Sequence, residues 1–184
     1  YDGTIEEGDL FLTTDPYACN GAISHINDWL LLRPIFKDGR LIAYAAMFGH
    51  MTDVGGKVPG SLPTDAREIF EEGIRVPPLK IFKNDELQTD VLNLILHNSR
   101  MPTWNRSDFN ALVAAMRTAE KRVIEMADRF GDDEYYSALD ELLARNKRAM
   151  GKLIKDTVPT KKQHFEDYIC DDGLGMGPYR IKCS

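Results

Sequence analysis

Two histidine–aspartate pairs near the start of the chain are the residues best suited to chemistry. His25 precedes Asp28 by three positions, and His50 precedes Asp53 by the same spacing. The second pair runs into Gly55-Gly56, where the backbone can approach a neighbour closely and adopt positive φ. Imidazole and carboxylate are ligands of zinc, manganese and iron(II). The repeat predicts one divalent metal site with two nitrogen and two oxygen ligands, although a lone pair of this kind is more often structural.

Two further carboxylates and one glycine-containing loop are candidates for roles beside that site. Asp15, followed by Pro16, either caps a turn or reaches the metal site as a ligand or base. Glu72, before Gly73, is a candidate general base or ligand, with a surface carboxylate as its ordinary interpretation. The segment Pro59-Gly60-Ser61 suits a phosphate or carboxylate, and it equally suits a stiff loop.

Composition excludes several classes of function. The chain has 184 residues, 43% hydrophobic and 28% charged, with a net charge of -6 that argues against a nucleic-acid surface. No apolar run approaches the roughly 18 residues that span a bilayer, so we expect no membrane segment. The three cysteines are irregularly spaced and include no C-x-x-C pair, which predicts free thiols in a reducing cytoplasm.

The first 85 residues are rich in glycine, proline and aspartate, and they contain short apolar runs typical of strands. We expect strands at 10–12, 29–32 and 41–48. Asp38-Gly39 predicts a tight hairpin turn, because both positions of such a turn need positive φ. The second strand of this hairpin ends at His50, so the hairpin would deliver one candidate ligand to a sheet end.

Residues 86–156 show helical spacing of apolar side chains, and residues 157–184 read as the start of a further β segment. Helices are expected at 90–97, at 107–130 with an N-cap at Ser107-Asp108, and at 133–155. Gly131 separates the last two, which predicts an antiparallel helical hairpin. The fold class is therefore α+β: a β-rich region with metal-site loops, then a helical hairpin. Both ends have an internal character, so we expect a fragment of a larger subunit.

The ordered set of motifs is similar to the hydantoinase B/oxoprolinase family over essentially the whole chain. This family includes the B-type subunit of N-methylhydantoinase and subunits of acetone and acetophenone carboxylases. The motifs are Asp15-Pro16-Tyr17, His25-x-x-Asp28, His50-x-x-Asp53-x-Gly55-Gly56, Pro59-Gly60-Ser61, and Glu72-Gly73 with Pro77-Pro78.

The resemblance implies a metal-containing subunit of an ATP-dependent cyclic-amide hydrolase or ketone carboxylase. A hydantoinase A-type partner would bind ATP and phosphorylate the substrate oxygen, giving a hetero-oligomer. His25, Asp28, His50 and Asp53 would be the metal residues, with Asp15 beside them. The chain itself carries no phosphate-binding loop motif.

Some residues depart from the family pattern, and two questions stay open. Thr14 replaces a usual asparagine, Met51 replaces a second histidine in many members, and residues 18–24 replace a glycine-rich run. Hydrolase and carboxylase remain alternatives, and the substrate is open. A non-catalytic assembly module, whose histidines only hold loops, is the alternative from another class of function.

Overall fold

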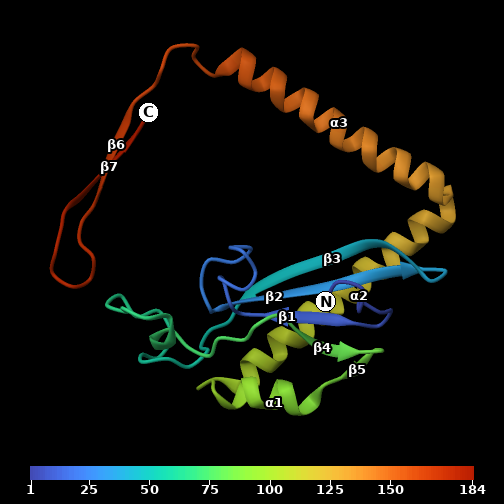
Figure 1. Cartoon of the computed structure of the whole chain (residues 1–184), viewed down its shortest axis with the longest axis horizontal. Coiled ribbons are helices and arrows are strands. Elements are labelled where there is room, and N and C mark those ends of the chain that lie inside the picture. Colours follow the sequence, from blue (N-terminus) through green and yellow to red (C-terminus); the bar gives the residue numbers. More distant parts are fainter. The chain divides into compact units, whose positions relative to one another are not determined.

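The computed structural model describes residues 1–184, which form two compact units, 1–124 and 125–184. Figure 1 shows the elements of each unit. The helices are all too short or too polar to cross a membrane.

The first unit is built on a five-stranded antiparallel sheet with the order β3-β2-β1-β4-β5. The expected hairpin is present, because β2 and β3 pair along their length and join through Asp38 (φ 51°) and Gly39 (φ 72°). The strands are β1 (Leu10–Thr13), β2 (Asp28–Lys37), β3 (Arg40–His50), β4 (Leu79–Lys83) and β5 (Glu86–Leu87), and a short 3-10 helix, η1 (Ile69–Glu71), precedes β4.

Helices α1 (Thr89–His97) and the first part of α2 (Pro102–Phe130) cover one face of this sheet. Alternate residues of β2, among them Trp29 and Leu31, point into the core, where Phe109 of α2 meets the Trp29 ring edge-on at 6.4 Å. The apolar stripe of α2 is therefore core packing on the sheet, with Val113 and Met116 buried beside Phe109.

The start of α2 differs from the expected one. The helix begins at Pro102, not at Ser107-Asp108, and both of those residues lie inside it. Proline suits the first helical position, because its fixed φ is already helical and the missing N–H would have no helical partner there. The N-cap expected at Ser107 is wrong for that reason.

The second unit contains the last residues of α2, the helix α3 (Asp132–Thr157) and a hairpin of β6 (Phe165–Ile169) and β7 (Tyr179–Cys183). Gly131, at φ 90°, separates the two helices as expected. No residue of α3 is buried. The predicted burial of its apolar stripe in an antiparallel helical hairpin is therefore not observed. An antiparallel sheet with helices segregated from it confirms the α+β class.

Candidate metal centre

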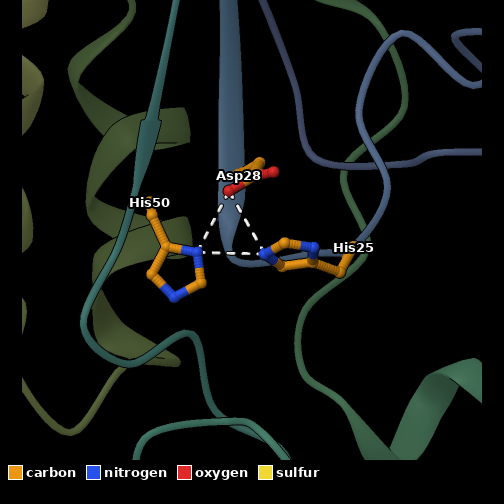
Figure 2. A group of neighbouring side chains, drawn as sticks. All are labelled: His25, Asp28 and His50. Atoms are coloured by element: carbon orange, nitrogen blue, oxygen red, sulfur yellow. Dashed lines mark hydrogen bonds and ion pairs between the residues drawn. The ribbon is translucent and has the colours of Figure 1, made fainter.

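The hairpin register and one turn bring three of the predicted ligands to a single point (Figure 2). Asp28 is the first residue of β2, His50 is the last residue of β3, and the two lie directly opposite each other. Directly opposed residues share a face of a sheet. His25 joins them because its carbonyl accepts a hydrogen bond from the Asp28 N–H (3.2 Å), which closes a tight turn.

Three ligand atoms form a nearly equilateral triangle. His25 Nε2 lies 3.0 Å from His50 Nδ1, His50 Nδ1 lies 3.1 Å from Asp28 Oδ1, and His25 Nε2 lies 3.3 Å from Asp28 Oδ1. Ligands bound at about 2.1 Å to one ion stand roughly 3.0 Å apart at right angles and roughly 3.4 Å apart in a tetrahedron. The triangle therefore fits one face of the coordination shell of a single divalent ion, in the manner of a two-histidine, one-carboxylate site.

The surroundings orient the triad. Ser24 Oγ lies 2.8 Å from His25 Nδ1, where the hydroxyl can accept the Nδ1 hydrogen and leave a lone pair on Nε2. The Asp28 side chain is only 10% exposed, whereas the His25 and His50 side chains are 35% and 47% exposed. The triad is thus anchored by a buried carboxylate and is accessible from the histidine side.

Asp53, the fourth predicted ligand, does not belong to this group. Its Oδ1 accepts hydrogen bonds from the Gly55 and Arg100 amides, and its Oδ2 accepts from the Gly60 amide and the Arg100 guanidinium. Both carboxylate oxygens are therefore fully used within the protein. The structure brings three of the four predicted residues together, and Asp53 instead organises the loop that follows His50.

The pKa of Asp53 is lowered, so its carboxylate is charged at neutral pH, as its structural role requires. Burial disfavours the charge, but hydrogen bonds from the amides of Arg100, Gly55 and Gly60 and from the Arg100 side chain outweigh it and lower the pKa of Asp53 to about 2. Arg100 also donates to the carbonyls of Gly55, Val58 and Gly56. No sequence pattern pointed to this role of Arg100, because its partners lie more than 40 positions away along the chain.

The other predicted site residues lie outside the triad. Asp15 Oδ1 accepts from the Tyr17 and Ala18 amides, and its Oδ2 lies 3.3 Å from Arg75, so Asp15 caps a turn outside the triad. Glu72 ends η1, also outside the triad. In Pro59-Gly60-Ser61, the donors considered for an anion are already used within the protein. The Gly60 amide donates to Asp53, and Ser61 Oγ donates to the Gly55 carbonyl and accepts from the Val54 amide.

Comparisons with known proteins place this chain in a family. A family model described as hydantoinase B/oxoprolinase matches residues 1–184. Over 177 residues, 96% of this chain, the sequence is 37% identical to caprolactamase subunit beta of Pseudomonas jessenii. Over 98% of this chain, it is 32% identical to the acetophenone carboxylase delta subunit of Aromatoleum aromaticum.

The fold agrees with these sequence matches. The crystal structure of the ATP-dependent caprolactamase of Pseudomonas jessenii superposes with a TM-score of 0.84 at 33% identity, covering 98% of this chain and 31% of that one. The chain spans 30% and 26% of the lengths of the two relatives named above. The expected family is confirmed over the full chain: it belongs to the hydantoinase B/oxoprolinase family.

Proposed function

We propose that this chain supplies the metal centre of an ATP-dependent enzyme that hydrolyses a cyclic amide or carboxylates a ketone. His25, Asp28 and His50 would hold Zn²⁺, Mn²⁺ or Fe²⁺. The observation that carries the proposal is the triangle of ligand atoms, with sides of 3.0–3.3 Å, formed by residues from a turn and two strand ends.

The ligand set is suited to catalysis because it occupies only one side of an ion. Three protein ligands leave at least one position open for a substrate or water. When bound, the ion supplies Lewis-acid stabilisation of negative charge that develops on a substrate oxygen. The chain's own contribution is to hold the two imidazoles and one carboxylate in register, with Asp28 fixed by burial and His25 fixed by Ser24.

We further propose a hydantoinase A-type partner that binds ATP and activates the substrate oxygen by phosphorylation. The motifs of a phosphate-binding loop are absent from these residues, and the similar caprolactamase is ATP-dependent by its description. Relatives are named as subunits, which supports a hetero-oligomer. The three cysteines are free, as in the reducing cytoplasm that we propose as the compartment.

Metal content tests the first part of the proposal. The full-length subunit should purify with about one divalent ion, and His50→Ala should lose it, as measured by elemental analysis. His164→Ala is the matched control, because His164 is exposed and remote in sequence from the triad. An ion retained by His50→Ala would refute the proposed ligands, and a subunit without any metal would favour the assembly module.

Turnover tests the second part. The subunit is assayed with and without its co-expressed partner, ATP and bicarbonate, on ε-caprolactam, hydantoin and acetophenone. ATP-dependent product that needs the partner supports the proposal, and a requirement for bicarbonate distinguishes carboxylase from hydrolase. Full activity of the subunit alone would show that no ATP-binding partner is needed.

A further inference from the structure

The face of the sheet opposite α1 and α2 carries an apolar pocket of about 220 Å³. Its floor comes from neighbouring positions of β1 and β2, where Phe11 lies opposite Leu32 and Thr13 lies opposite Leu30. Cys19 and Pro78 close its sides. The pocket is therefore built from elements of the first unit alone, on a rigid antiparallel ladder.

Strand periodicity places this pocket on the same face as the metal triad. Side chains alternate between faces, so Asp28, Leu30 and Leu32 of β2 point to one side. Leu30 is two residues from Asp28, which corresponds to about 7 Å along the strand. The segment that contributes Cys19 to the pocket wall also leads directly to His25. The pocket and the triad are thus adjacent parts of one surface.

The residues that line the pocket are suited to a hydrocarbon ligand. The only hydroxyl of the strand floor is that of Thr13, which donates to the Val76 carbonyl (2.9 Å) and accepts from the Asp15 amide (3.1 Å). The Tyr1 hydroxyl is directed to the Pro78 carbonyl (3.4 Å). With these polar groups engaged, the remaining lining offers methyl, ring and thiol surface. A volume of about 220 Å³ equals roughly seven waters of liquid, and it is smaller than the pockets that hold drug-sized ligands.

We infer that this pocket, with Leu30 and Leu32 as its floor, binds the hydrocarbon ring of the substrate whose carbonyl reacts at the triad. The inference rests on the proposed function and adds the substrate class: compact cyclic amides or ketones with an unsubstituted apolar ring. Leu30 is the specificity-determining residue, since it lies between the ring site and Asp28.

The test uses the full-length subunit in complex with its partner, loaded with Mn²⁺. The probes are 2-pyrrolidinone, 2-piperidone and ε-caprolactam, with cyclopentanone, cyclohexanone and cycloheptanone in parallel. Binding is measured by NMR as the relaxation that Mn²⁺ induces in the methylene protons. We expect affinity to rise about fourfold for each added methylene in at least one series, the gain expected for a buried CH₂.

Two variants probe the pocket itself. Leu30→Phe and Cys19→Leu should each fill the pocket, weaken ring binding at least tenfold and flatten the dependence on ring size, with Mn²⁺ still bound. Leu143→Phe, at an exposed position of α3, is the control and should change neither quantity. Two results would overturn the inference and leave the metal site standing. In the first, Mn²⁺ is bound but the relaxation does not depend on ring size. In the second, Mn²⁺ is bound and neither filling variant weakens ring binding. Failure to bind Mn²⁺ at all would instead refute the proposed function on which the inference depends.

Discussion

Replacing Asp53 by asparagine should loosen the loop that follows His50. The carboxylate is 1% exposed, and four hydrogen bonds from Gly55, Gly60 and Arg100 converge on it. Asparagine keeps the shape but has a single acceptor oxygen, so its NH₂ group would face either the Gly55 and Arg100 amides or the Gly60 amide and the Arg100 guanidinium. The variant therefore loses the charge and also leaves buried donors without an acceptor.

The magnitude follows from the pKa of Asp53. A fall from 3.8 to about 2 corresponds to about 2 kcal/mol of stabilisation of the folded loop by the charged form. Because the folded pKa is the lower one, this stabilisation is complete above about pH 5 and is lost as the pH falls through 3.8 toward 2. At neutral pH the Asn variant should lack all of it, and near pH 3 the difference from wild type should be smaller.

Amide hydrogen exchange measures this local opening. The amides of Gly55, Gly60 and Arg100 should exchange roughly 30-fold faster in Asp53→Asn at pH 7, if opening of this loop governs their exchange. Asp65→Asn is the control on the same loop: its ion pair with Lys57 is solvent-exposed, so its loss should change exchange by less than about fivefold. Equal protection in the two variants would refute the role assigned to Asp53.

Three further predictions concern the framework of the site, each measured in the full-length subunit. Leu112→Ala should cost roughly 1–3 kcal/mol in urea unfolding, less than Phe109→Ala, because Leu112 is half-buried where its Cδ1 packs close to Gly49; an equal cost would contradict this packing. Gly56→Ala should increase proteolysis at Lys57, because an added Cβ would lie 2.5 Å from the Glu71 carbonyl oxygen. Gly60→Ala is the control: it has open space around it, and its φ of 82° should lower the free energy of unfolding by only about 1–2 kcal/mol. Similar cleavage of both variants would be evidence against the contact at Gly56. Arg33→Met should destabilise by about 1–3 kcal/mol, because it leaves half-buried Glu120 without its partner, whereas exposed Asp85 is hydrated; Arg148→Met, in an exposed pair with Glu141, should cost at most about 1 kcal/mol, and equal losses for the two variants would contradict the role of the Arg33–Glu120 pair.

Local sequence signals predicted the hairpin that carries two of the three clustered residues, Asp28 and His50. Asp38-Gly39 fixes a two-residue turn, which sets the register of the residues beside it, and an irregularity between Ile35 and Phe36 then shifts the pairing by one residue. The register of the turn alone would pair Asp28 with Gly49, so this shift, which the turn residues do not predict, is what places Asp28 opposite His50. His25 and Asp28 are joined by a local turn, so their proximity depends only on residues close in the sequence.

Tertiary contacts decided which of the two identical spacings joins the cluster of candidate ligands. Asp28 and Asp53 each follow a histidine by three positions, but Asp53 lies beyond its strand and is engaged by Arg100, 47 positions away at the junction of α1 and α2. Such a contact depends on how the helices pack on the sheet, and no local pattern encodes it. The apolar pocket on the same face has the same origin, since Tyr1, Ile5, Cys19 and Pro78, which lie far apart in the sequence, line it together with residues of β1 and β2. The sequence by itself thus determined the types of the candidate ligands and the hairpin, and long-range packing determined which of these residues meet and which surface lies next to them.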